Sequence, residues 1–413
     1  MIVNTSNPGG SSMKVSVRTA GSRARVCLVV VAVCVAGGKL MAANPEQTRA
    51  RMDRIFSALV TVLPLSLNGA DYEKTSNRDL VLSKLKDLSD ESQGLEAHAG
   101  ANDKTFAFIA GSLSKDARDI YRWYSRGSYG ESRYLLHNLT ENCIACHSRL
   151  PETKGFPAAQ EFFKDVKVAN LPLMDRAQLQ MATRQFDAAL ATYEELFKSA
   201  ETRTSEIIMM DGFVDYLKVC IRVKQDVNRA IPVLEAMLKR PDLPKFAALQ
   251  IEQWIASLKR LSMRHDKAGS ELQVARKLIS DAQRASEFRM DRGRLVDYIY
   301  ASKLLNAFVH RKDPGSPTGG SVAQPSKAAQ NDMAEAYYLL GVTESMIGRS
   351  YWLSQTEFYL ETAVRTAPHS KIAEKAYALL EEQVVVEFSG SAGTNVPEDM
   401  QKTLDDLRRL MKH

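Results

Sequence analysis

The residues best suited to chemistry in this 413-residue chain form one short run, Cys143-Ile144-Ala145-Cys146-His147. Two cysteines three positions apart, followed at once by a histidine, have the spacing of c-type haem attachment. Both thiols can form thioether bonds to the porphyrin, and the adjacent imidazole can then reach the iron as its proximal axial ligand. We therefore expect one covalent haem c, attached through Cys143 and Cys146, with His147 bound to the iron.

Three other uses of such a cysteine pair compete with haem attachment: a redox pair, half of a zinc site and a structural disulfide. A zinc site needs a second pair of ligands, and Cys220 is the only other cysteine after residue 43. A thioredoxin-like redox pair belongs in a βαβ context, whereas the flanking sequence has helical periodicity. Cys220 lies in an apolar stretch and is expected to be a small buried hydrophobic residue. These comparisons favour haem attachment.

Residues 1–43 differ in composition from the rest of the chain. Basic residues precede an apolar run over 26–36, and small residues follow it, which is the pattern of a secretory signal peptide. The apolar run is shorter than the ~20 residues that span a bilayer, so we expect export to the periplasm and no permanent membrane span. The formal charge is +6, and removing the five basic residues of this leader leaves the mature chain near +1. That balance gives no reason to expect a nucleic-acid partner.

Between Glu46 and Pro151 the periodicity of apolar residues predicts four amphipathic helices. The first runs over about 46–63 and the second over about 76–95. The third starts after Asp103 and ends in the region of Gly127 and Gly130, and the fourth begins near Glu131 and extends through Cys146. On the fourth helix Cys143 and Cys146 continue the apolar stripe begun by Leu136 and Leu139. The haem is therefore expected between the helices and not on a loop.

This arrangement resembles the class II c-type cytochromes, the cytochrome c′ and c556 group, whose attachment motif also lies late on the fourth helix. The resemblance covers about a quarter of the chain and implies a four-helix haem domain over residues 44–151. In that family the first helix lines the distal side of the haem. Some members supply a methionine as the sixth ligand there, and others leave the iron five-coordinate. Met52 is the matching residue here, and it either ligates the iron or is part of the core.

Other side chains near the haem motif are weaker candidates for contact with the cofactor. His137 lies on the same helix as the motif and projects about 80° away from His147, and His98 ends the second helix. Arg49 and Arg51 flank Met52 and could pair with the haem propionates, although exposed helix charges are the simpler interpretation.

After a connector over 152–172, residues 173–413 are predicted to form tetratricopeptide-like helical hairpins. The segment from Phe186 to Leu196 has the small and aromatic residues of the second helix of such a repeat, with Ala189 where two helices approach closely. Ala230 repeats this position, and Gly341 and Ala363 resemble the pattern again. The predicted fold is therefore all-α: an N-terminal four-helix bundle with covalent haem, followed by an α-solenoid of helical hairpins.

The expected function is one-electron transfer, with the helical-repeat domain docking a redox protein partner on its concave surface. The alternative is a five-coordinate haem module that binds or senses a gas. An enzyme is not expected, because no residue of the repeat region stands out as catalytic. His265, His310 and His369 are isolated there and are interpreted as surface or capping residues.

Overall fold

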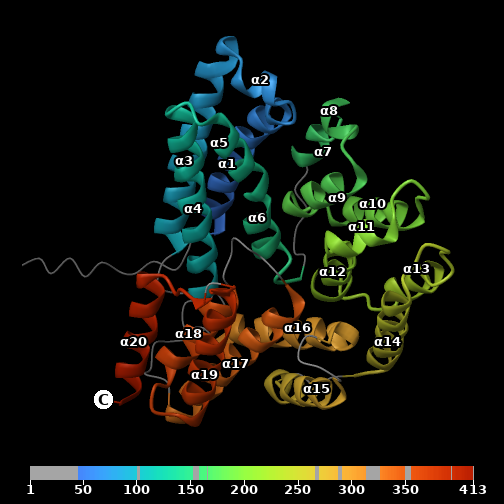
Figure 1. Cartoon of the computed structure of the whole chain (residues 1–413), viewed down its shortest axis with the longest axis vertical. Helices are drawn as coiled ribbons and strands as arrows, with labels where there is room; N and C mark the ends of the chain where they lie inside the picture. Colours follow the sequence, from blue (N-terminus) through green and yellow to red (C-terminus); the bar gives the residue numbers. More distant parts are fainter. Residues whose placement is uncertain are drawn as a thin grey trace, which may run out of the picture. The chain divides into compact units, whose positions relative to one another are not determined.

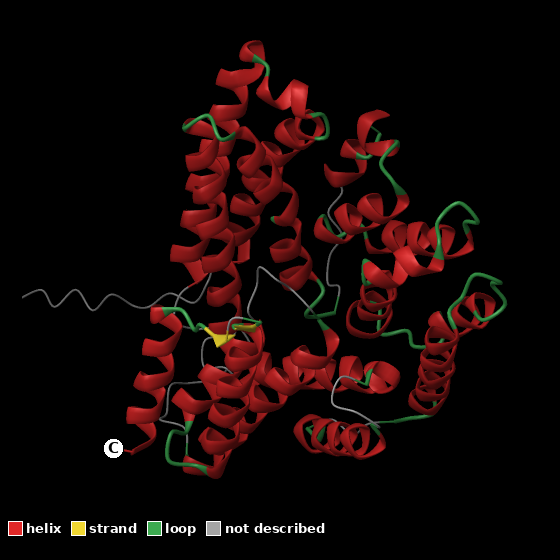
Figure 2. Cartoon of the chain, in the orientation of Figure 1, coloured by secondary structure: helices red, strands yellow, loops and turns green. Residues whose placement is uncertain are grey.

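The computed structural model describes residues 45–99, 103–151, 158–164, 166–265, 269–286, 291–312, 326–348, 355–391 and 393–412. The predicted signal peptide lies outside these ranges. The described chain is helical almost throughout, which confirms the all-α class (Figure 2). Its two short strands, β1 (Ser389–Gly390) and β2 (Gly393–Thr394), form one antiparallel pair. In the described ranges no helix has both the length and the apolar composition that a membrane crossing needs.

The first group of helices corresponds to the region in which four helices were predicted (Figure 1). Its elements are α1 (Pro45–Ser66), α2 (Gly69–Glu73), the 3-10 turn η1 (Thr75–Asn77), α3 (Arg78–Ala99), α4 (Lys104–Ser125), α5 (Tyr129–Asn138) and α6 (Thr140–His147). Helix α3 packs against both α1 and α4, and α4 also packs against α5 and α6. The predicted fourth helix is thus two helices that meet at Leu139.

A hydrophobic cluster, called the first core here, holds α1, α3, α4 and α5 together. The most completely buried members include Ile55, Val81, Leu85, Leu88, Ala117, Ile120 and Leu136. All of these but Ile55 lie on the predicted apolar stripes. On α1 the predicted stripe is corrected, because Met52, Phe56 and Leu59 are only half-buried while Ile55, Ala58 and Val62 are buried. Burying each such aliphatic side chain contributes roughly 1.5–3 kcal/mol. Two buried hydroxyls of this core are paired: Tyr124 donates to the carbonyl of Tyr72 at 3.0 Å, and Ser132 donates to that of Ile120 at 2.9 Å. The stripe periodicity therefore predicted the core contacts of α3, α4 and α5, but not the buried face of α1.

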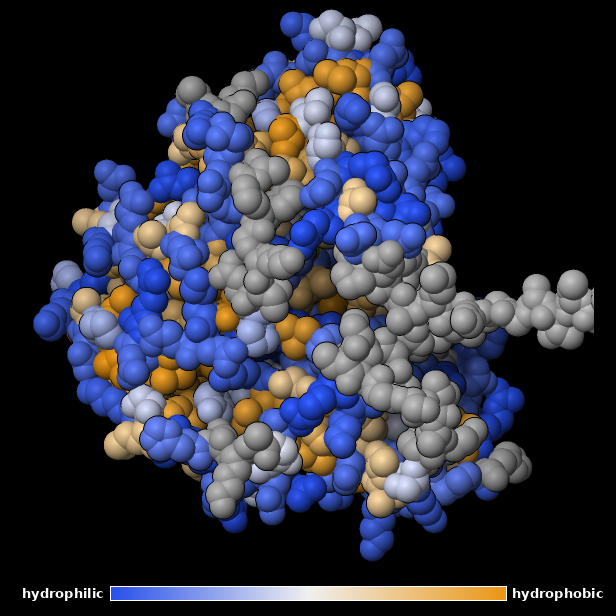
Figure 3. All heavy atoms as spheres, turned by 180° about the vertical axis from the view of Figure 1, so that it is seen from behind, coloured by the Kyte–Doolittle hydropathy of each residue, from blue (hydrophilic) through white to orange (hydrophobic). Residues whose placement is uncertain are grey.

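The second group of helices follows from residue 158 onward. Its elements are α7 (Ala158–Phe162), α8 (Val166–Ala169), α9 (Leu173–Ala182), α10 (Phe186–Lys198), α11 (Thr204–Met209), α12 (Gly212–Lys218), the π-helical turn η2 (Val219–Val223), α13 (Ala230–Met237), α14 (Lys245–Ser262), α15 (Glu271–Ala285), the 3-10 turn η3 (Arg292–Arg294), α16 (Leu295–Lys312), α17 (Lys327–Ile347), α18 (Gln355–Thr366), α19 (Lys371–Glu387) and α20 (Glu398–Lys412). Consecutive helices pack against each other at α9–α10, α13–α14 and from α15 through α20. The face of the molecule in Figure 3 is largely hydrophilic, with hydrophobic side chains scattered over it.

A second hydrophobic cluster, the second core, joins most of these helices. The small residues picked out from the repeat-like pattern lie inside it, because Ala189, Ala230 and Ala363 are each fully buried. At Gly341 on α17 the helices approach so closely that a Cβ atom would lie 2.6 Å from Cδ2 of Leu360 on α18. Close helix packing through small residues is therefore a real feature of this part of the chain.

Candidate functional site

Helix α6 carries the complete Cys-X-X-Cys-His run at its C-terminal end. The helix packs against α4, α5 and α9, so it lies where the first group of helices meets the second. Leu136 and Leu139 belong to the first core, but Ile144 belongs to the second core and Cys143 packs against it. The expectation that the cysteines continue the stripe of Leu136 and Leu139 is therefore corrected. The helix assignment breaks at Leu139, and the segment after this residue packs against α9.

The His147 ring is oriented by a hydrogen bond to the second group of helices. Its Nδ1 lies 2.8 Å from the carbonyl oxygen of Ala182, the last residue of α9. A carbonyl can only accept, so Nδ1 must carry the proton and Nε2 keeps its lone pair. Burial, reinforced by the nearby charge of Arg184, lowers the pKa of His147 to about 4. The imidazole is thus neutral near pH 7 and has a free Nε2, which is the state that binds a metal ion.

The two thiols are half-buried and unbonded to each other. Burial raises the pKa of Cys143 to about 12 and also raises that of Cys146. Reactive redox pairs have the opposite environment, because the attacking thiol needs a lowered pKa. Within the described ranges, no group of three or more His, Cys, Asp or Glu side chains is placed to hold a metal ion. The raised thiol pKa values are therefore unlike those of a reactive redox pair.

A buried ion pair lies directly after the motif. Arg149 is 8% exposed, and its Nη2 donates to Oδ2 of Asp103 at 3.0 Å. Asp103 also caps α4 by accepting from the backbone N–H of Phe106 at 2.8 Å. Burial alone would raise the pKa of Asp103, but hydrogen bonds from His310 and Arg149 outweigh it, and the pKa lies well below the usual range. Asp103 is therefore a fixed negative charge that joins α4 to the end of α6.

His310 on α16 is part of this arrangement, contrary to its interpretation as an isolated residue. Its Nδ1 lies 3.5 Å from Oδ2 of Asp103, although 207 positions separate them. Arg149, two positions after His147, could have been noticed as a motif neighbour. For Asp103 and His310 the sequence carried no local signal, because only the tertiary packing brings them to the motif.

Several buried polar atoms on α6, on α9 and on the residues that follow these two helices have no hydrogen-bond partner among the described residues. They are Asn142 Oδ1, Arg149 Nε, Gln180 Oε1 and Arg184 Nε. Buried polar atoms are nearly always paired in folded proteins, so four unpaired ones on the two elements joined by the His147 hydrogen bond are informative. Two arginine donors suit a group with carboxylates, and the haem carries two propionates. The residues around the motif therefore fit the cofactor that its spacing predicts.

The candidate distal ligand lies in a different environment from the motif. Met52 on α1 is half-buried and packs against the first core, whereas His147 is held by α9 of the second group. Arg51, beside it, is engaged with α3 through a 3.1 Å contact from Nη1 to Oε2 of Glu91. Arg49 is exposed. Arg51 is therefore not free to pair with a propionate, and the ligand role of Met52 stays a prediction.

His137, the other described candidate histidine of the first region, bonds away from the motif. Nε2 of His137 is 3.1 Å from Oγ of Ser66, at the far end of α1 from Met52. Burial lowers the pKa of His137. The side chain of His98 lies outside the described residues.

Comparison with known proteins found no match to this chain. No family model matches it, and neither a curated protein nor a solved structure matches it. The functional argument therefore rests on the sequence motif and the geometry around it.

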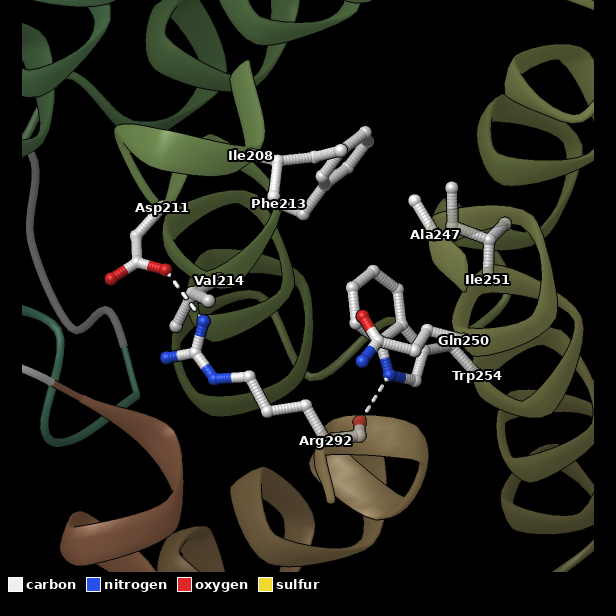
Figure 4. Close-up of a pocket in the computed structure, with 9 residues that line it drawn as sticks. All are labelled: Ile208, Asp211, Phe213, Val214, Ala247, Gln250, Ile251, Trp254 and Arg292. Atoms are coloured by element: carbon white, nitrogen blue, oxygen red, sulfur yellow. Dashed lines mark hydrogen bonds and ion pairs between the residues drawn. The ribbon is translucent and has the colours of Figure 1, made fainter. Parts of the chain in front are cut away.

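A second candidate site is a pocket between α12, α14 and η3 (Figure 4). Its volume is about 340 Å³ including space open to solvent, and it is lined by Ile208, Asp211, Phe213, Val214, Ala247, Gln250, Ile251, Trp254 and Arg292. Across its floor Nη1 of Arg292 pairs with Oδ1 of Asp211 at 2.8 Å, and the Trp254 indole donates to the carbonyl of Arg292 at 2.7 Å. Because its two charges neutralise each other, the pocket suits an apolar group.

Four large apolar residues that neighbour the lining residues in sequence are exposed. Met209 and Met210 lie between Ile208 and Asp211, and Phe246 and Leu249 lie on α14 beside Ala247 and Gln250. Their exposed fractions are 84%, 46%, 60% and 57%, respectively. Exposed apolar side chains that form a contiguous patch are typical of surfaces that bind another protein.

Proposed function

We propose that this chain is a mono-haem c-type cytochrome that transfers single electrons after export to the periplasm. In this proposal residues 44–151 form the four-helix haem domain and residues 173–413 form the helical-repeat solenoid. The observation that carries it is the state of His147: its Nδ1 is committed to the Ala182 carbonyl and its Nε2 is free. The ring lies directly after two cysteines at the attachment spacing.

Each residue of the motif has a separate task in this function. Cys143 and Cys146 hold the porphyrin edge, and His147 ligates the iron while α9 fixes its tautomer and orientation. Bound haem supplies one-electron chemistry at its iron. The surrounding helices limit the access of water to the attachment helix, because Ile144 and Asn142 are buried. No substrate turnover is part of the proposal.

The decisive test is covalent haem in protein exported from a strain competent in cytochrome c maturation. We expect the wild type to keep its Soret absorption after acid–organic extraction, and the double variant C143A/C146A to lose it. Cys220→Ala is the matched control, since Cys220 is buried in the second core away from the motif and its loss should leave haem content unchanged. The proposal would be refuted if the wild-type protein lost all its haem on extraction and had free thiols at both Cys143 and Cys146.

A five-coordinate gas-binding site is the second candidate, and one observation favours it. Met52 packs against the first core, while the motif helix packs against the second through Ile144 and Cys143. If Met52 does not reach the iron, the sixth position is open to a small ligand such as nitric oxide or carbon monoxide. The ferric spectrum separates the two functions: a methionine–iron charge-transfer band supports electron transfer, and a high-spin spectrum supports gas binding.

The redox partner is proposed to dock on the helical-repeat region near the pocket of Figure 4, at the exposed apolar residues that neighbour its lining. The double variant M209S/F246S removes one such side chain next to Ile208 in sequence and one next to Ala247. We expect periplasmic redox proteins to reoxidise this variant about tenfold more slowly, while its reaction with a small-molecule oxidant stays unchanged. Met263→Ser is the control, because Met263 is also exposed (73%) but lies nine positions beyond Trp254, the nearest lining residue on α14. Equal rates for both variants would argue against docking at these residues.

A further inference from the structure

Arg184 occupies a strained position beside the attachment motif. It follows α9 directly and has a φ of 60°, in the left-handed region that non-glycine residues seldom adopt. The turn is fixed by backbone hydrogen bonds from Arg184 N–H to Met181 O at 3.0 Å and from Gln185 N–H to Gln180 O at 2.7 Å. Strain of this kind persists where the surrounding structure over-determines a side chain's position, and it often marks functional sites.

The same turn holds both Arg184 and the residue that orients His147. Ala182, two positions earlier, accepts the hydrogen bond from Nδ1 of His147. The positive charge of Arg184 adds to the burial that lowers the pKa of His147, and it offsets part of the rise that burial causes in the pKa of Cys146. Both effects place the guanidinium close to the end of α6.

The Arg184 guanidinium is incompletely satisfied by the protein. Its Nε is buried and has no hydrogen-bond partner among the described residues. A second cation, Arg149, lies nearby but is engaged with Asp103 through two of its nitrogens, at 3.0 and 3.4 Å. Arg184 is half-buried, and a buried donor that is left without an acceptor is unfavourable. An anionic acceptor therefore suits this position, and a carboxylate matches the planar guanidinium best.

We infer that Arg184 binds a carboxylate of the haem attached to α6 and thereby links the helical-repeat region to the cofactor. This inference rests on the proposed function, which brings that carboxylate to the motif. Arg184 is a positioning residue: it belongs to the turn after α9, outside the four-helix region, and it does not ligate the iron. The second group of helices then contacts the haem twice, through the Ala182 carbonyl on His147 and through Arg184.

The test uses the full-length holoprotein and the variant Arg184→Gln. Loss of a cation near the iron favours the more positive ferric state. We expect the reduction equilibrium to shift about tenfold toward the oxidised form, which corresponds to 59 mV for a one-electron couple. The resonance Raman bands of the haem carboxylates should shift as well. The control is Arg176→Gln on α9, because Arg176 is already paired with Glu195 at 3.1 Å and its loss should change neither readout.

The outcomes separate the inference from the function on which it rests. Wild-type protein without covalent haem refutes the proposed function itself. If Arg184→Gln binds haem normally and has the reduction potential and carboxylate bands of the wild type, only the inferred role of Arg184 is overturned. If Arg184→Gln does not accumulate as holoprotein, Arg184→Lys is measured instead. Because lysine keeps the positive charge, the reduction equilibrium should stay within about twofold of the wild type, whereas the resonance Raman bands of the haem carboxylates should shift. Unchanged carboxylate bands in Arg184→Lys would overturn the inference.

Discussion

Replacing Gly341 with alanine tests the close approach of α17 and α18 quantitatively. The added Cβ would lie 2.6 Å from Cδ2 and 2.7 Å from Cγ of Leu360. Leu360 is fully buried, so it cannot swing away into solvent. Overpacking of a core costs about 1–3 kcal/mol, whereas exchanging glycine for alanine inside a helix contributes about 1 kcal/mol of stabilisation. The clash should outweigh the helix propensity, and we expect a net loss of about 1 kcal/mol.

Gly111→Ala provides the matched comparison for this prediction. Gly111 also lies inside a long helix, α4, but its added Cβ would meet only Oε1 of Glu96, at 3.4 Å. The end of that side chain can move, so the helix-propensity gain should remain and the variant should be stabilised by about 0.5–1 kcal/mol. Urea unfolding followed by circular dichroism measures both free energies.

The reasoning fails if Gly341→Ala is as stable as Gly111→Ala. A second check is the double variant G341A/L360A, in which the smaller side chain at position 360 makes room for the new methyl group. Its loss of stability should be less than the sum of the two single losses, because residues in contact do not act additively. Strict additivity would show that Gly341 and Leu360 do not oppose each other.

Three further predictions concern the first group of helices and the motif. Asp103→Asn should cost about 3–5 kcal/mol of folding free energy, because it leaves the buried Arg149 without its counter-charge; a urea midpoint equal to that of the wild type would contradict this. For His137 the folded-state pKa is lowered by burial, while the unfolded histidine titrates near ~6.5, so the unfolded state binds more protons below that pH. Stability should therefore fall as the pH drops from 7.5 to 5.5, and His137→Gln should reduce the fall in unfolding free energy measured at these two pH values. Met52→Leu should abolish the methionine–iron charge-transfer band if Met52 is the sixth ligand, and identical ferric spectra would remove it from the site.

The helices themselves could be predicted from the sequence because their signals are local. Apolar residues recur with the helical period over α1, α3 and α4, and the residues on those stripes, such as Leu85 and Ile120, are fully buried. The small residues of the repeat-like pattern were equally informative, since Ala189 and Gly341 lie where helices touch. Periodicity and residue size are properties that a single segment carries by itself.

The break between α5 and α6 could not be predicted, because leucine, the residue type at position 139, is common inside helices. Leu139 keeps helical dihedral angles, with φ −56° and ψ −27°, and no glycine or proline marks the position. As a result the periodic stripe was extended through Cys143 and Cys146, although that segment packs against the second core. The direction in which a helix turns after such a junction depends on distant partners, which here include α9.

The surroundings of the motif depend on long-range packing in the same way. The residue types of the motif predicted haem chemistry, but Asp103, Arg184 and His310 reach it only through the tertiary fold. An arginine after a helix and a histidine near the end of another are ordinary features of a sequence. Their relation to His147 becomes visible only when α4, α9 and α16 are in place.

The hydrogen bond from His147 to Ala182 has a consequence for the order in which the protein matures. The acceptor lies 35 residues downstream of the ring that it orients, so a nascent chain emerges with its motif well before the partner carbonyl exists. Until α9 has docked, either ring nitrogen is free to carry the proton. If the chain binds haem as proposed, completion of the downstream helices is a step in its maturation, and a chain ending before α9 should carry haem whose axial ligation is heterogeneous.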